Sequence, residues 1–267
     1  MNTRRISRGV TLLELLVVMM VLSLILTAAV KTWDVTLERS RFETTRRKLN
    51  QISEVIVGNP DYIVSGNRVD FGYVGDVGAL PQVLDDLVRR PVGFPESGTW
   101  RGPYIRSTFS ESPTGYRTDG WGDSLIYNTD SLFLRSYGGR GLVEQDRWLT
   151  RTLGYTRDAL LNNTVSGVVL DVRGIPPPNE IFNGVDVRVE FSGPQGGLMQ
   201  DFPVFLLNDG QFEITNVPQG NLHELRAVFK FVRPPLDSVE ARKTITVYPG
   251  RGARDIQLRL NTDWTAP

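Results

Sequence analysis

The sequence predicts an α+β protein in which a long N-terminal helix carries a small mixed head, and an all-β sandwich follows. Three observations lead to this class. An apolar run opens the chain, a helical pattern continues it as far as residues 58–60, and alternating strand-like segments fill residues 164–260. The 267 residues suffice for two folded domains. The expected divisions are a short basic leader (1–9), the helix (10–60), the head (61–160) and the sandwich (161–267).

The first part of the helix has the length and composition of a membrane span. From Val10 to Val30 the only charged residue is Glu14. A helix of this length rises about 31 Å, close to the thickness of a hydrocarbon core. Basic residues flank the run: Arg4, Arg5, Arg8 and Lys31. The positive-inside rule therefore places the N-terminus in the cytoplasm and the bulk of the chain beyond the membrane.

Beyond Val30 the helix is predicted to become amphipathic. Apolar residues recur there at helical spacing: Phe42, Leu49, Ile52, Val55 and Ile56. We expect this stripe to pack on the head and the charged residues between its members to face water. Gly58 and Pro60 predict that the helix ends at Val57. From Val10 it would then measure about 72 Å.

Glu14 needs an explanation, because a carboxylate within a membrane costs roughly 2.5–3.5 kcal/mol. A secretory signal peptide cut near Ala29 would make this residue incidental. However, the apolar run is longer than the roughly 7–15 residues of a signal's apolar region. A plain membrane anchor would leave the carboxylate without a role. The residues around Glu14 suggest a third interpretation.

The segment RGVTLLELLVVMMVLSLI resembles the N-terminus of type IV pilins and pseudopilins. The shared features are a basic leader, a glycine, an apolar first mature residue and Thr-Leu-Leu-Glu. The resemblance implies that a prepilin peptidase cuts between Gly9 and Val10 and then methylates the amino group of Val10. Valine departs from the family's usual Phe or Met, which bears more on methylation than on cleavage. Glu14 would be the fifth mature residue and would lie near the Val10 amino group of a neighbouring copy, since two buried charges are tolerated best as a pair.

A second resemblance covers the head. The segments TWRGPYI, TDGWGDSLIYN and SYGGRG are similar to those of the major pseudopilin of type II secretion. The matching residues are Gly102, Pro103, Tyr104, Asp119, Trp121, Gly122, Tyr127, Ser136, Gly138 and Gly141. On the residues alone, we expect a short helix around 84–88, a hairpin around the turn at 128–131 and a turn that places Trp121 over a small core.

Members of that family often bind calcium in the loop after the last turn. Here the loop departs from the family pattern because Arg140 stands among its glycines, and a cation cannot serve as an oxygen ligand. Glu144 and Asp146 are the remaining weak candidates for a calcium site. We expect no other cofactor, and a loop that packs without metal is the favoured alternative.

No catalytic machinery is expected. The chain has no cysteine and a single histidine, His223, for which we expect a partly buried or surface position in a strand. Four aspartates that resemble acid pairs are assigned to turns and helix surfaces: Asp85, Asp86, Asp119 and Asp123. Lys and Arg together balance Asp and Glu at 30 each, so no strong positive field favours nucleic acid as a partner.

Seven short segments with period-two alternation predict the C-terminal sandwich, with Val185, Val187, Val189 and Phe191 as the clearest alternation. VSGVVLDVRG and DGQFEITNVPQGN resemble the transthyretin-like, carboxypeptidase-regulatory-like sandwich. The residues that carry this resemblance are Asp209, Gly210, Phe212, Val217, Pro218 and Gly220.

Together these resemblances imply a non-enzymatic pseudopilin of a type II secretion-like system. It would be a single-pass protein of the bacterial inner membrane with its bulk in the periplasm. Its expected partners are the prepilin peptidase, copies of itself, other pseudopilins and the assembly platform of the secretion machine. A surface type IV pilin with an adhesive sandwich, and a secreted sandwich with an ordinary signal peptide, remain the alternatives.

Overall fold

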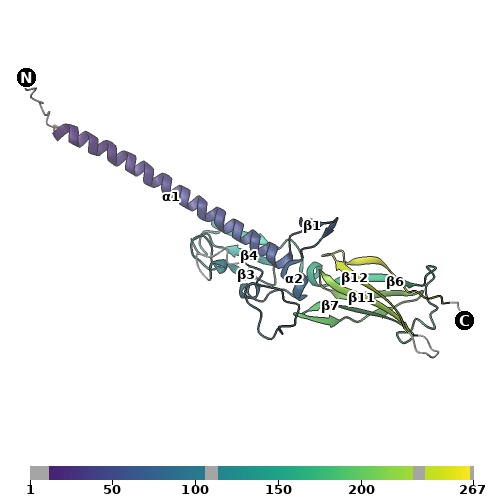
Figure 1. Ribbon diagram of the computed structural model, residues 1–267. Coiled ribbons are helices and arrows are strands. Elements are labelled where there is room, and N and C mark those ends of the chain that lie inside the picture. The colour runs from purple at the N-terminus through teal and green to yellow at the C-terminus, as the bar shows by residue number, and fades with distance from the viewer. Residues whose placement is uncertain (1–11, 106–113, 231–237, 265–267) are drawn as a thin grey trace, which may run out of the picture.

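The computed structural model describes residues 12–105, 114–230 and 238–264. The molecule is elongated, with α1 (Leu12–Val57) leaving the head at one end and the sandwich continuing from the other (Figure 1). The first half of α1 stands free of the rest, whereas its second half lies along the head. The predicted α+β class, a long apolar N-terminal helix before a β-rich region with several sheets, is confirmed.

The end of α1 is fixed by packing and by one glycine. Leu49, Ile52 and Ile56 are buried against the head, as the helical spacing predicted. The helix ends at Val57, and Gly58 follows with φ +83°. A Cβ at Gly58 would lie 2.4 Å from the carbonyl oxygen of Asp70, so this turn needs glycine both for its backbone angle and for space.

The head is built from short elements around the second half of α1. In chain order they are β1 (Ile63–Val64), β2 (Asn67–Arg68), α2 (Gly72–Val77), η1 (Leu84–Leu87), η3 (Gly115–Arg117), β3 (Ile126–Asn128), β4 (Phe133–Ser136), η4 (Gln145–Arg147), β5 (Leu149–Thr152) and α3 (Arg157–Leu161). The predicted hairpin is present as β3–β4, and β5 extends it to an antiparallel sheet of three strands. The short helix expected around 84–88 is a 3-10 helix.

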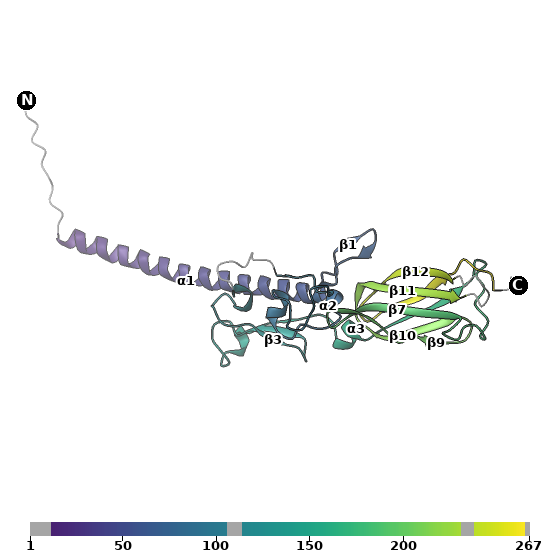
Figure 2. The same ribbon diagram turned by 60° about the horizontal axis from the view of Figure 1, so that its bottom comes forward.

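Two four-stranded sheets form the C-terminal part (Figure 2). One has the order β13-β6-β10-β9 and the other the order β12-β11-β7-β8. The strands are β6 (Asn163–Leu170), β7 (Val187–Gln195), β8 (Leu198–Asp201), β9 (Phe205–Leu206), β10 (Gln211–Val217), β11 (Gly220–Lys230), β12 (Ser238–Val247) and β13 (Ala253–Arg259). Neighbouring strands are antiparallel except β13 and β6, which run parallel.

The two sheets enclose one apolar core, separate from that of the head. Val165 and Phe212 enter it from one sheet, and Val189 and Phe191 enter it from the other. The alternation predicted for β7 is present from Val187 onward, but Val185 precedes the strand and is exposed. Strand β8 was not predicted from the sequence. All four of its side chains are exposed, so buried and exposed positions do not alternate along it.

The expectation for His223 is wrong. The side chain is completely buried in β11, where its ring stacks on Phe191 with centroids 5.5 Å apart. Among the described residues, neither ring nitrogen has a hydrogen-bond partner. Burial lowers the pKa of His223 to about 4, and the nearby Gly220 backbone offsets this only in part. The sequence could not reveal this, because the strand pattern does not say how deeply a sheet is covered.

Candidate assembly surface

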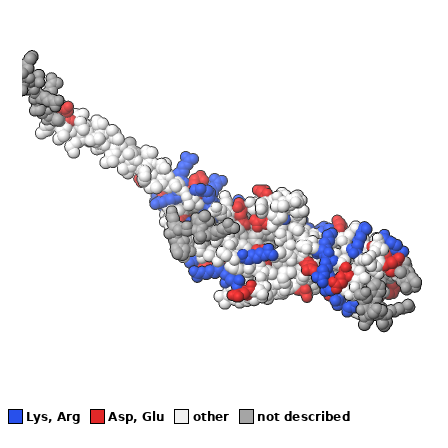
Figure 3. All heavy atoms as spheres, in the orientation of Figure 1, with Lys and Arg blue, Asp and Glu red and all other residues white. Residues whose placement is uncertain are grey.

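The free half of α1 is an apolar stalk with almost no charge (Figure 3). Its exposed large hydrophobic residues, among those the structure describes, are Leu12, Leu13, Leu15, Leu16, Val17, Val18, Met19, Met20, Val21, Leu22, Leu24, Ile25, Leu26 and Val30. By length and composition α1 can cross a membrane, since an 18-residue window reaches a mean hydropathy of 2.6 with none of it buried. An apolar surface of this size requires a cover of lipid or of other helices.

Glu14 lies in the first turn of α1 as the structure describes it, among exposed apolar neighbours. An acidic residue in the first turn interacts favourably with the positive end of the helix dipole. Gly9 and Val10 lie outside the described residues, so the cleavage bond and the predicted pairing of Glu14 with a neighbouring Val10 stay predictions.

The head begins at Glu38. Among the residues of α1 whose burial is described, this is the first that is partly buried, and its carboxylate accepts hydrogen bonds from Arg147 at 2.8 Å and from the indole N–H of Trp121 at 3.3 Å. The Trp121 ring also packs edge-on against Phe42, with ring centroids 5.3 Å apart. Trp121 therefore packs on the side of α1, whereas the sequence predicted that it would cover a small core; it is not among the residues that form the apolar core of the head.

A buried carboxylate organises the turn that presents Trp121. Asp119 accepts hydrogen bonds from the backbone N–H groups of Trp121 and Asp123, each at 2.9 Å, and from the Ser136 hydroxyl at 2.6 Å. These contacts join three of the residues that carried the resemblance of the head. Asp85 and Asp86 also bind locally, Asp85 to the Tyr116 hydroxyl and Asp86 to the backbone N–H groups of residues 82 and 83.

The loop after Gly141 contains the two predicted calcium candidates. Glu144 and Asp146 are both exposed, and the described residues contain no group of three or more His, Cys, Asp or Glu side chains that could hold a metal ion. Calcium also takes backbone carbonyl and water oxygens as ligands, so a calcium site in this loop and a loop that packs without metal both stay predictions. Arg147 of the same loop is paired with Glu38.

Comparison with protein families gave a match at the N-terminus of the chain. Residues 4–30 match the model of the prokaryotic N-terminal methylation motif. The match indicates a pilin-like protein, of the type IV pilin or pseudopilin kind, and it includes Gly9, Val10 and Glu14. Comparison with curated proteins and with solved structures gave no match. The motif spans 27 of the 267 residues, so the finer resemblances of the head and of the sandwich remain predictions.

The sandwich of this pilin-like chain is joined to its head by buried contacts. Gln219, which is fully buried, donates its side-chain N–H to the carbonyl oxygens of Val57 at 2.9 Å and of Phe71 at 3.2 Å. Val57 is the last residue of α1, so a side chain of the sandwich caps the end of the helix. At the same junction, the backbone N–H of Gly197 donates to the carbonyl of Val77 at 2.9 Å.

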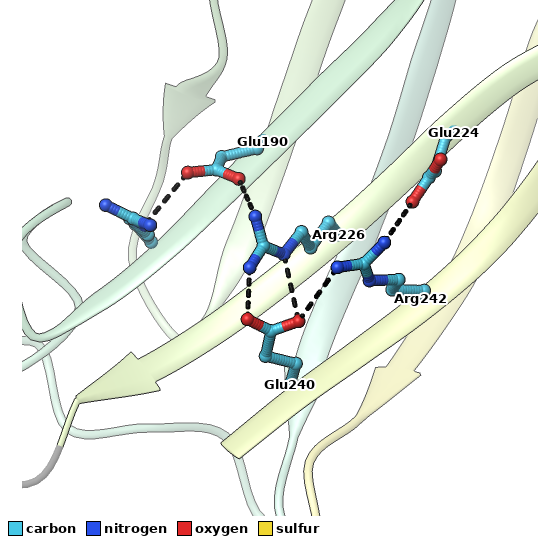
Figure 4. A network of polar contacts seen from close by, with 6 residues as sticks. Glu190, Glu224, Arg226, Glu240 and Arg242 are labelled. Carbon is cyan, nitrogen blue, oxygen red and sulfur yellow. Dashed lines mark hydrogen bonds and ion pairs between the residues drawn. The ribbon is translucent and has the colours of Figure 1, made fainter. Parts of the chain in front are cut away.

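A ladder of paired charges covers one outer face of the sandwich (Figure 4). It crosses β7, β11 and β12 through Arg188, Glu190, Arg226, Glu240, Arg242 and Glu224. Hydrogen bonds from Arg226 hold the pKa of the Glu240 carboxyl below its usual range. The ladder contains three cations and three anions, so it keeps the sheet face polar without creating a strong net field.

The free half of α1 was predicted from the sequence, but the contacts that fix its second half to the head and to the sandwich were not. The pairing of Glu38 with Arg147 joins residues 109 positions apart, and the contact of Gln219 with Val57 spans 162. No periodicity or motif connects such pairs. The apolar stripe of α1 was the one signal that the head would dock there.

Proposed function

We propose that this chain is a structural subunit of a periplasmic pseudopilus in a type II secretion-like system. The observation that carries the proposal is the continuity of the methylation motif with α1. The motif leads directly into a helix whose first half is exposed and apolar, and whose second half is fixed to a folded head.

The proposed cycle begins at the inner membrane. A prepilin peptidase cuts between Gly9 and Val10 and methylates the new amino terminus. The assembly platform then moves subunits out of the bilayer, and the free halves of α1 pack together, with copies of this chain and with other pseudopilins. The growing filament does mechanical work on exported proteins, and the chain itself catalyses no reaction in this scheme.

Glu14 would favour the move of α1 from the lipid bilayer into the filament. Lipid and a bundle of helices are both apolar, so apolar side chains gain little from moving between them. A carboxylate in lipid is costly, and a neighbour's Val10 amino group within the filament would reduce that cost. We therefore expect Glu14 to favour assembly and to set the stagger between neighbours.

Mass spectrometry of the mature N-terminus, on protein from the membrane fraction, tests the proposal first. We expect a peptide that begins at N-methylated Val10. A start near Ala29 would instead show an ordinary signal peptide and a secreted sandwich, and the proposal would be abandoned.

The substitution Glu14→Leu tests the assembly step. We expect the variant to remain in the membrane but to lose filaments in sheared and sedimented fractions. Glu43→Leu is the matched control, because Glu43 is an exposed acid on the second half of α1 and should leave assembly intact. Filaments of Glu14→Leu at the level of the unmodified protein would contradict the pairing.

A surface type IV pilin with an adhesive sandwich is the second candidate, because the motif fits it equally well. Deletion of the chain separates the two. Failure to export secreted proteins supports the pseudopilus, whereas loss of surface fibres with normal export supports the pilus.

A further inference from the structure

The loop between β4 and β5 is held closed at its base. The rings of Tyr137 and Trp148 pack against each other with centroids 5.2 Å apart, and the Trp148 indole N–H donates to the carbonyl of Gly141 at 3.2 Å. Gly138 is crowded by Arg147, since a Cβ there would lie 2.5 Å from the Arg147 carbonyl oxygen. We call residues 138–147 the basal loop.

The basal loop lies at the edge of the head nearest the free half of α1. Its Arg147 pairs with Glu38, where the head begins, and Gly139 lies directly against the Trp121 ring, which packs on Phe42. In Figures 1 and 2 the teal part of the head lies at this end of the molecule. Within the described part of the head, this loop therefore lies at the edge that faces a membrane holding the free half of α1.

The outer end of the basal loop is apolar. Leu142 is 65 % exposed and the adjacent Val143 is 91 % exposed. Burying one such side chain is worth about 1.5–3 kcal/mol, and in the structure both side chains are left in contact with water. A surface that covers both side chains would provide this stabilisation.

The distance along α1 places the loop within reach of a bilayer. Eight residues separate Val30, the end of the apolar run, from Glu38, which corresponds to about 12 Å of helix. The headgroup region extends about 5–7 Å beyond the hydrocarbon core on each side. Val143 lies four residues from either Gly139 or Arg147, and four extended residues span up to about 13 Å. Trp33, 68 % exposed on α1, lies within the interval where interfacial tryptophans are common.

We propose that Leu142 and Val143 insert into the periplasmic surface of the bilayer that holds α1. The proposal rests on the proposed function, which places α1 in the inner membrane. The basal loop then forms a second membrane contact that sets the tilt of the head before assembly and is released when the subunit leaves the bilayer.

Single-cysteine labelling tests this contact, because the natural sequence contains no cysteine. The full chain carrying Val143→Cys, with an environment-sensitive dye on the new thiol, is placed at low density in vesicles of phosphatidylcholine and phosphatidylglycerol. Some of the lipids carry a quencher just below the headgroup. We expect a blue-shifted emission and a loss of intensity to the lipid quencher. Val143 is already exposed, so the label should not disturb folding.

Two matched positions complete the design. Val92→Cys is the control for an exposed valine elsewhere, since Val92 is fully exposed two residues from Phe94, which adjoins Gly197 of the sandwich. We expect neither shift nor quenching there. Leu24→Cys reports on α1 itself and should be quenched by lipids that carry the quencher deep in the acyl chains.

The outcomes separate the two proposals. If Leu24→Cys is not quenched, the membrane placement of α1 fails and the basal-loop contact fails with it. If Leu24→Cys is quenched but Val143→Cys behaves like Val92→Cys, the loop contact is overturned and the proposed function stands. A blue shift at Val143→Cys that grows with protein density and shows no lipid quenching would assign the loop to a neighbouring copy, which also overturns the lipid contact.

Discussion

The two ends of the head are built in different ways. At the end near the free half of α1, the half-exposed Glu38 holds a glycine-rich loop through one ion pair and one indole contact. At the other end, Gln219 and His223 are fully buried, and the backbones of head and sandwich approach so closely that only glycine fits at Gly78. The difference indicates that the sandwich is a permanent extension of the head, whereas the basal edge can adapt to changing surroundings.

The largest effect should come from Gly78→Ala at the far end. Gly78 has φ +68°, and a Cβ there would lie 1.9 Å from the carbonyl oxygen of Pro194 in the sandwich. The left-handed backbone costs about 1–2 kcal/mol for alanine, and the clash adds about 1–3 kcal/mol. We expect urea unfolding to show a loss of about 2–5 kcal/mol in the free energy of unfolding.

Gly141→Ala at the near end is its matched control. Gly141 has φ +65°, but nothing lies within 4 Å of its Cβ position. It should therefore cost only the backbone strain of about 1–2 kcal/mol. Equal losses for the two variants would show that the head and sandwich are not in close contact at Gly78.

The second largest loss of stability is expected at low pH, because His223 is buried in its neutral form. The folded pKa of His223, about 4, lies below the ordinary value of 6.5, so between these values the unfolded chain binds more protons than the folded one. Stability is therefore lost as the pH falls from 6.5 towards 4, by at most about 3 kcal/mol. Denaturant titrations at several pH values should show this slope, and His223→Leu should flatten it. An unchanged slope in His223→Leu would mean that the ring is not buried neutral.

Gln219→Leu should have a smaller effect at the same junction. It removes the donor to the carbonyls of Val57 and Phe71 while it keeps most of the volume. Each carbonyl retains another donor, from Arg68 and Gly75 respectively, so we expect a loss of about 1–2 kcal/mol. Gln200→Leu, an exposed position in β8, is the control and should be nearly neutral. A neutral Gln219→Leu would show that this hydrogen bond does not hold the junction.

The smallest effect is expected at the near end. Glu38→Gln removes the charge partner of Arg147 but leaves an oxygen for Trp121. Because both members of the pair are partly exposed, we expect a loss below about 1 kcal/mol in thermal or urea unfolding. A loss comparable with that of Gly78→Ala would contradict the contrast between the two ends.

Local residue patterns were enough to predict the long helix, with an apolar first half and an amphipathic second half. A run with one charge from Val10 to Val30 can lie only in an apolar environment or be covered, and the stripe through Leu49, Ile52 and Ile56 has the helical period. Gly58 then supplies the stop signal. Period-two alternation likewise predicted most strands of the sandwich, because these patterns are local and reflect the geometry of one element.

The contacts between the helix, the head and the sandwich could be seen only in the folded molecule. It buried His223, whose sequence context does not say which sheet covers it, and it brought Gln219 to the end of α1 and Arg147 to Glu38. It also left Leu142 and Val143 of the basal loop exposed, although apolar residues of this kind are usually buried in a core. These outcomes depend on contacts between residues far apart in the chain, and side-chain chemistry alone does not encode which distant surface a residue will meet.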